Sequence, residues 1–194
     1  MEKKEIIDHK TRFLIRNILK GFLYLGVLIA VFLLVKSYFS EQERSEWFGS
    51  IYDNVPLVMS VFVASEILFG IIPPEVFMLW SLNTGWIGSY FSSIGLLSVI
   101  SYLAGFANFT IGALAKASSK TLKTKNKIIQ KYRSLFQIYG AHLVIVACVS
   151  PLPFSAISLL AGAGGMDKKK YLLYSLLRIL RFFVYAYVLY RIEA

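Results

Sequence analysis

Long apolar runs alternate with short charged segments along the chain. Residues 21–39 form one apolar run, residues 86–115 form a second that is studded with Gly and Ser, and residues 171–191 form a third. Each run approaches or exceeds the roughly 18–20 residues that an α-helix needs to cross a bilayer. The pattern therefore predicts an all-α integral membrane protein with about three full transmembrane helices.

Two further apolar stretches, at about residues 55–85 and 141–165, are broken by prolines. The interrupting residues are Pro73 and Pro74 in the first stretch and Pro151 and Pro153 in the second. Proline disfavours helical geometry in the residue before it and lacks a backbone donor, so each stretch divides into pieces too short to span the membrane singly. Each stretch is therefore either a kinked spanning helix or a re-entrant hairpin. Broken backbone at membrane depth must lie against protein or a watery cavity.

The two broken stretches share a layout. Pro74 is followed eleven residues later by Gly85, and Pro153 is followed eleven residues later by Gly164. The flanking charges make the first stretch start from the outer side and the second from the inner side. Two half-crossing segments in inverted orientation that approach each other near the midplane are a known way to build a transport site. We therefore expect two inverted re-entrant hairpins.

Composition and charge agree with this assignment. The chain of 194 residues is 57% hydrophobic and only 16% charged, whereas soluble domains carry about a quarter charged residues. The net charge of +10 is concentrated in residues 1–20 and 116–133, and acids dominate residues 38–56. The positive-inside rule then predicts a cytoplasmic basic N-terminus over 1–20 and one membrane domain over 21–194. The charge indicates topology and contact with anionic lipid rather than nucleic acid.

Residues 116–139 are basic, and their apolar residues recur at spacings of three, four or seven. This spacing predicts an amphipathic helix that lies on the inner leaflet. An ordinary solvated basic loop is the alternative for the part before Lys127. The residues expected to contact inner-leaflet lipid are Lys120, Lys123, Lys125, Lys127, Lys131 and Arg133.

The sequence offers no catalytic or metal-binding constellation. It has one cysteine, Cys148, and its two histidines, His9 and His142, are far apart. No HExxH or GxSxG motif is present, and Cys148 has no nearby base. We therefore expect neither an enzyme nor a metal or cofactor site.

Three motifs, taken in order, resemble the DedA/VTT superfamily, which includes the SNARE-associated Golgi protein group. They cover roughly residues 55–185. The motifs are Glu66 with Pro73-Pro74-Glu75, then Phe109-Thr110-Ile111-Gly112, then Ser150-Pro151-Leu152-Pro153-Phe154 leading to Ala161-Gly162 and Met166.

The chain departs from the family pattern at three positions. Cys148 and Phe154 stand where many members carry arginines, and Gly105 stands where an acid is common. The last apolar run instead supplies Arg178 and Arg181. An arginine inside the membrane is costly and usually faces a partner or a cavity. We expect one of these two to pair with an anionic lipid headgroup or with a glutamate of the first hairpin, the alternative being that both snorkel to the inner interface.

The resemblance implies a membrane lipid translocase of the bacterial plasma membrane, which acts as a flippase or scramblase for phospholipids or polyprenyl phosphates. In some members this activity is linked to proton flux. A non-transporting envelope scaffold and an ion-coupled transporter of a soluble substrate remain alternatives. The residues expected along the transport path are Glu66, Pro73, Pro74, Glu75, Ser150, Pro151, Pro153, Arg178 and Arg181.

The two glutamates of this set are not equivalent in the sequence. Glu75 directly follows Pro73-Pro74, where a carboxylate in the first turn of a helix stabilises the helix dipole. A structural role therefore explains Glu75 as well as a functional one. Glu66 lies within the apolar run and has no such explanation, so it is the stronger candidate for exchanging protons or binding substrate.

The predicted topology can be tested by cysteine labelling in intact cells. A membrane-impermeant thiol reagent is expected to label a Ser45→Cys variant from outside and to leave a Lys125→Cys variant unlabelled. The unmodified chain, whose only cysteine is Cys148, is the background control. Labelling of position 125 from outside would contradict the topology.

Overall fold

The computed structural model describes most of the chain between residues 53 and 193. The described residues are 53–68, 70, 72–118, 140–150 and 152–193, with seven single positions between 19 and 38. The predicted transmembrane helix at 21–39 therefore falls largely outside them, and the basic segment does so beyond Ser118. Also outside are Pro151 and the six predicted lipid-contact residues, Lys120, Lys123, Lys125, Lys127, Lys131 and Arg133.

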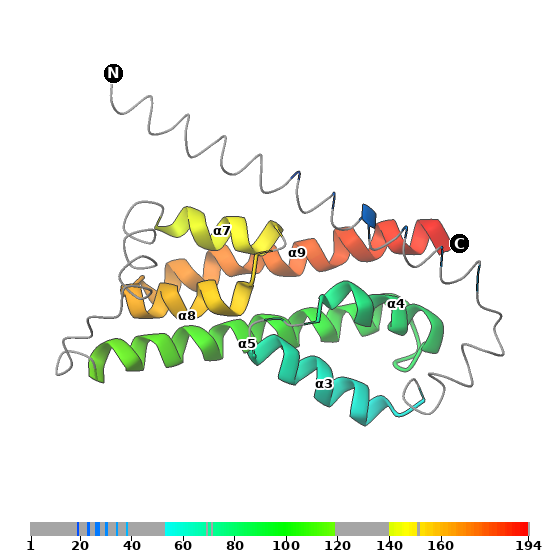
Figure 1. The fold of residues 1–194 in the computed structure, drawn as a ribbon, viewed down its shortest axis with the longest axis horizontal. Coiled ribbons are helices and arrows are strands. Elements are labelled where there is room, and N and C mark those ends of the chain that lie inside the picture. The colour runs from blue at the N-terminus through cyan, green and yellow to red at the C-terminus, as the bar shows by residue number, and fades with distance from the viewer. Residues whose placement is uncertain are drawn as a thin grey trace, which may run out of the picture.

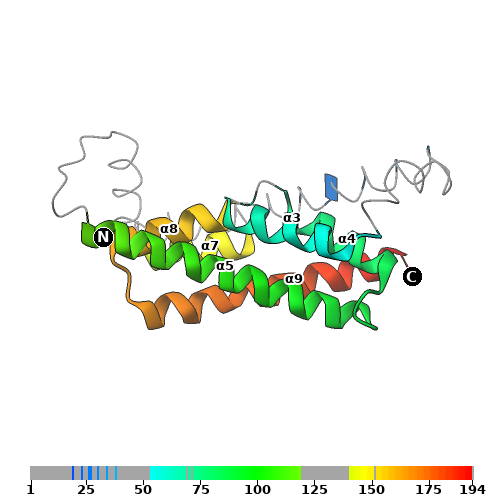
Figure 2. The same cartoon turned by 90° about the horizontal axis from the view of Figure 1, so that it is seen from below.

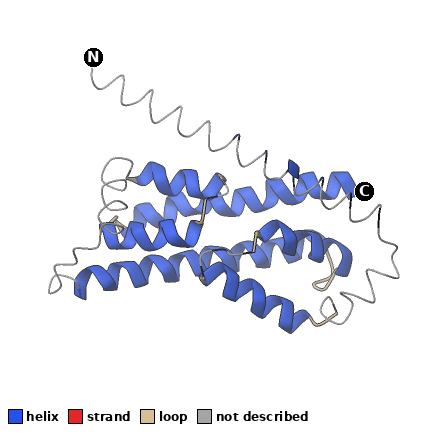
Figure 3. Cartoon of the chain, in the orientation of Figure 1, coloured by secondary structure: helices blue, strands red, loops and turns tan. Residues whose placement is uncertain are grey.

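The described part of the chain contains helices joined by loops and no strand (Figure 3). Two of its helices are long and apolar enough to cross a bilayer, over Tyr90–Lys116 and Lys168–Ile192. The elements are α3 (Val55–Ile67), α4 (Pro74–Thr84), α5 (Tyr90–Ser118), α7 (Ala141–Val149), α8 (Phe154–Gly164) and α9 (Lys168–Glu193). The all-α class is therefore confirmed, and the full number of spanning helices stays a prediction.

The four short helices form two pairs that lie along opposite halves of α5 and α9. In Figures 1 and 2, α3 and α4 lie beside the beginning of α5 and the end of α9, and α7 and α8 lie beside the other ends. The helices α5 and α9 run in opposite directions (Figure 1). Each pair is interrupted at the predicted prolines, with Pro73 preceding α4 and Pro153 preceding α8. This arrangement has the inverted layout of two broken helical pairs.

The register of the repeat differs from the prediction by one residue. Gly85 caps the C-terminus of α4 and Gly165 caps that of α8, and both glycines adopt the left-handed conformation, with φ of 54° and 80°. Gly164, predicted to correspond to Gly85, is instead the last residue of α8. Glycine enters this conformation without steric cost, so it commonly ends helices. The matching positions are therefore Pro73 with Pro153 and Gly85 with Gly165.

Two apolar clusters fill the two halves of the molecule. The first joins α3 and α4 to the beginning of α5 and the end of α9, and the second joins α7 and α8 to the remaining halves. On α9, for example, Tyr171 belongs to the second cluster and Phe182 to the first. Buried Arg178 and Arg181 lie between them along the helix. A polar layer therefore separates two apolar layers.

Helices α5 and α8 approach each other closely at two glycines. A Cβ atom on Gly112 would clash with the backbone of Leu159, and one on Gly162 would clash with the backbone of Phe109. Lipid tails are as apolar as leucine, so helices in a bilayer associate mainly through such close packing and through polar contacts. This crossing fixes α8 against α5 and thereby fixes the position of the second break.

This close approach predicts a strong effect of a single methyl group. We expect Gly162→Ala to lower the free energy of unfolding of the detergent-solubilised protein by about 1–3 kcal/mol, because the clashing partner is backbone and cannot rotate away. Gly95→Ala is the matched control, since its added Cβ would meet only the Phe183 ring at an ordinary 3.9 Å. Equal stability of the Gly162→Ala variant and the control variant would contradict the crossing.

Candidate functional site: two buried ion pairs at the helix breaks

The first ion pair joins the end of α3 to the middle of α9. The Nη2 of Arg178 donates to both carboxylate oxygens of Glu66, at 3.0 and 2.8 Å. The hydroxyl of Ser101 on α5 donates to Glu66 Oε2 at 2.7 Å and accepts from Arg178 Nε. Glu66 is 1% exposed and Arg178 4% exposed. Three helices therefore share one buried, hydrogen-bonded charge pair.

The second ion pair joins the start of α4 to the next turn of α9. Arg181 Nη2 donates to Glu75 Oε1, and both side chains are buried. Glu75 lies in the first turn of α4, so it stabilises that helix end as well as pairing with arginine. Arg181 Nη1 also donates to the carbonyl of Ser150 at 3.0 Å. Ser150 ends α7, so Arg181 connects the two broken pairs to each other.

Arg178 and Arg181 lie near the middle of α9. At about 1.5 Å per residue, they are roughly 15 and 20 Å along a helix that runs from Lys168 to Glu193. Their guanidinium groups contact Glu66 and Glu75. The structure therefore gives both of these arginines carboxylate partners.

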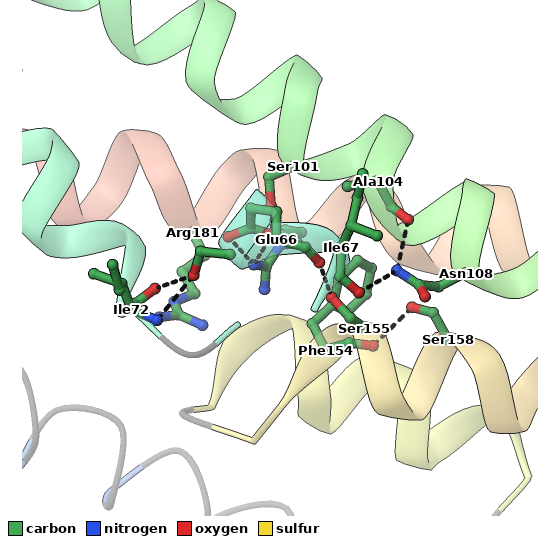
Figure 4. A network of polar contacts seen from close by, with 12 residues as sticks. Glu66, Ile67, Ile72, Ser101, Ala104, Asn108, Phe154, Ser155, Ser158 and Arg181 are labelled. Atoms are coloured by element: carbon green, nitrogen blue, oxygen red, sulfur yellow. Dashed lines mark hydrogen bonds and ion pairs between the residues drawn. The ribbon is translucent and has the colours of Figure 1, made fainter. Parts of the chain in front are cut away.

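Side chains satisfy the backbone groups that the breaks leave open. Ser65 accepts from the Ile72 N–H at 2.8 Å and donates to the Ile72 carbonyl at 3.2 Å, which closes the connection between α3 and α4. Asn108 donates to the Ile67 carbonyl at 3.3 Å. An unsatisfied backbone group is very costly at membrane depth. Figure 4 shows these contacts on either side of Glu66.

A hydroxyl links the two breaks directly. The Oγ of Ser155, in the first turn of α8, donates to the carbonyl of Glu66 (Figure 4). Together with the Arg181 contact to Ser150, this places the end of α3, the start of α4, the end of α7 and the start of α8 around one polar layer.

The structure brings together most of the residues that the sequence singles out. Glu66, Glu75, Ser150, Arg178 and Arg181 share the polar layer, and the prolines stand at its edge. Pro73 and Pro74 begin α4, and Pro153 precedes α8. Pro151 lies outside the described residues, so its place in the site stays a prediction.

Four polar residues of the layer were not predicted as site residues: Ser65, Ser101, Asn108 and Ser155. Ser101 falls among the small residues of the second apolar run, where serine also serves close packing. Asn108 has a clearer signal, because its amide lies inside a predicted span and must find partners there. The sequence therefore marks these residues as unusual, but it does not predict which groups they contact.

The three departures from the family pattern lie on the α8 side of Arg178. The Arg178 guanidinium lies over the Phe154 ring, 4.4 Å from its centroid. A Cβ on Gly105 would clash with that same ring. Cys148 is fully buried and donates to the carbonyl of Tyr174, one turn before Arg178, at 3.7 Å. An aromatic and apolar surface therefore occupies positions where charge was expected.

The VTT domain family matches residues 58–191 of the chain. The chain belongs to the DedA/VTT family. It is therefore a membrane protein of a family associated with membrane transport or lipid-related functions. No curated protein and no solved structure gives a significant match. The VTT domain includes all four members of the two ion pairs.

The first ion pair predicts strong coupling between its members. Removing one partner of a buried pair costs about 3–5 kcal/mol, because the other charge is left uncompensated, whereas replacing both with apolar residues is often nearly neutral. We expect Glu66→Met and Arg178→Met each to destabilise the VTT domain in unfolding measurements in detergent. The double variant should be far more stable than the sum of the two effects.

Arg191→Met is the control for this cycle, because Arg191 is exposed near the end of the same helix. We expect it to change stability little. Additive effects of Glu66→Met and Arg178→Met would contradict the pairing.

Proposed function

We propose that this VTT domain translocates lipids with anionic headgroups across the bilayer, as a flippase or scramblase, with proton uptake at the buried glutamates. The observation that carries the proposal is the pair of Glu–Arg contacts, Glu66 with Arg178 and Glu75 with Arg181, half-way along α9 where four helix ends meet. Charges at this depth are rarely tolerated without a function. We place the protein in a bacterial plasma membrane with its N-terminus in the cytoplasm.

An arginine that holds a carboxylate is also suited to a phosphate. Guanidinium groups bind both anions through two parallel N–H donors. A lipid phosphate that reached the polar layer could therefore replace Glu75 on Arg181 without leaving the cation unpaired. This exchange avoids the high energetic cost of an isolated buried charge.

Proton linkage follows from the carboxylate that such an exchange displaces. A glutamate released into a buried site would be an uncompensated negative charge, and binding one proton makes it neutral. When the headgroup enters and the displaced glutamate takes up a proton, the site carries one negative charge fewer than it would after headgroup entry alone. Release of the headgroup would return the proton and restore the ion pair.

The proposal is tested with purified protein in proteoliposomes that contain fluorescent lipid analogues. We expect translocation of a lipid with a phosphate headgroup, and strong loss of this activity in Glu66→Gln and Arg181→Ala. Arg191→Ala, which removes an exposed arginine of the same helix, should retain activity.

Three outcomes decide among the functions under consideration. Unchanged translocation in both site variants would refute a role for the ion pairs. Absence of translocation for every lipid would refute the proposal and favour a scaffold. Ion-driven uptake of a soluble substrate without lipid movement would favour the transporter alternative.

A further inference from the structure

The donors of the two buried arginines are used differently. Arg178 donates from Nε to Ser101 and from Nη2 to Glu66. Arg181 donates from its two terminal nitrogens, to Glu75 and to the Ser150 carbonyl, but its buried Nε has no acceptor in the described part of the chain. Arg181 therefore holds an N–H group that is ready for a further acceptor.

A second unpartnered group lies next to it. The hydroxyl of Ser150 is fully buried and has no hydrogen-bond partner among the described residues. The carbonyl of this same residue accepts from Arg181 Nη1 at 3.0 Å, so the two unpartnered groups belong to residues joined by a hydrogen bond. Buried polar groups nearly always have partners, so two unused groups on one bonded pair of residues indicate an absent ligand or water.

Helix α8 begins four residues after Ser150, and its start offers further donors. The first backbone hydrogen bond of this helix runs from the Ile157 N–H to the Pro153 carbonyl, so the N–H groups of Phe154, Ser155 and Ala156 precede the helical ladder. The first turn of α8 holds no acid, and no side chain caps it. Such a helix end attracts anions through its free N–H groups and its dipole.

The equivalent start of α4 likewise has no side-chain cap, but it differs in charge and in donors. Glu75 already places a carboxylate in its first turn, and Pro74 has no N–H to offer. The two breaks are therefore matched in backbone layout but differ in charge, because the α4 end holds a built-in anion and the α8 end does not. A single external anion would complete the symmetry.

We propose that the break between α7 and α8 is a phosphate subsite formed by Arg181, the Ser150 hydroxyl and the first-turn N–H groups of α8. Phosphate fits this donor set because one group presents several oxygens to an arginine, a hydroxyl and backbone N–H groups at once. The ion pair of Arg178 with Glu66 holds the first hairpin in place and does not bind the ligand. The site deepens the proposed function, and it rests on that function only in assigning the phosphate to a lipid.

Binding is measured by calorimetry with the purified full chain in a neutral detergent. The two probes are a short-chain phosphatidate and inorganic phosphate. We expect Ser150→Ala to weaken phosphatidate binding by about tenfold or more, because it removes a hydrogen bond to a charged group. Ser81→Ala is the matched control, since Ser81 also carries a fully buried hydroxyl without a described partner but lies in α4.

The two arginines are compared by replacement with lysine, which retains charge but loses the planar donor fork. We expect Arg181→Lys to weaken phosphatidate binding while the protein remains folded. We expect Arg178→Lys to lower the thermal midpoint while the folded protein keeps its affinity. Equal loss of affinity in both variants would overturn the assignment to Arg181.

The remaining outcomes separate this inference from the proposed function. If Ser150→Ala bound phosphatidate with the affinity of the unmodified protein, the subsite would be overturned and water would be its occupant. This would hold even if lipid translocation were observed. Binding of inorganic phosphate as tight as that of phosphatidate would support the subsite with free phosphate as its ligand. Site-dependent phosphatidate binding without any translocation would support the subsite and refute only the transport function.

Discussion

Buried charges and interrupted backbone at the centre of a membrane protein each need hydrogen-bond partners. In this VTT domain the charged side chains and the helix breaks supply partners for one another. Arg178 and Arg181 would be costly half-way along a spanning helix, and so would the open carbonyls at the ends of α3 and α7. Arg181 binds the Ser150 carbonyl and Glu75 at once. Arg178 binds Glu66, whose own carbonyl accepts from Ser155. Removing any one of these groups leaves another unsatisfied.

This mutual dependence accounts for the layered arrangement of the molecule. The polar layer can exist only where four helix ends meet, so the two broken pairs must approach each other from opposite halves of α5 and α9 (Figure 1). Apolar clusters pack on either side of that layer. The close crossing of α5 and α8 at Gly112 and Gly162 fixes the second break against α5.

The proposed exchange of anions is compatible with the same arrangement. In the described conformation each arginine has a carboxylate partner, so the layer is electrically balanced without a ligand. A second anion can enter only by displacing a carboxylate or by using donors that remain free. Arg181 and Ser150 offer such donors, whereas the Arg178 contacts are built into the junction of three helices. Under the proposed phosphate subsite, structural support and ligand binding fall to different arginines.

The sequence predicted the breaks, the long apolar helices and most charged residues of the site, because each leaves a local signal. Proline ends a helix wherever it stands, and a glutamate in an apolar run is conspicuous. Pairing is not local, since Glu66 and Arg178 are 112 residues apart along the chain. The one-residue error at Gly164 arose because two adjacent glycines carry the same signal, and only backbone conformation distinguishes them. Ser101 and Asn108 were missed as site residues because short polar side chains in a span serve packing as readily as they bind charge.

The central claim is that Arg178 and Arg181 of α9 are both paired with glutamates in a lipid bilayer. Solid-state NMR of the protein in bilayers can measure the dipolar coupling between glutamate carboxyl carbons and arginine guanidinium nitrogens directly. We predict short-range couplings for two glutamates, one lost in Arg178→Lys and the other in Arg181→Lys. Couplings that neither substitution removes, or their absence in the unmodified protein, would contradict the paired polar layer.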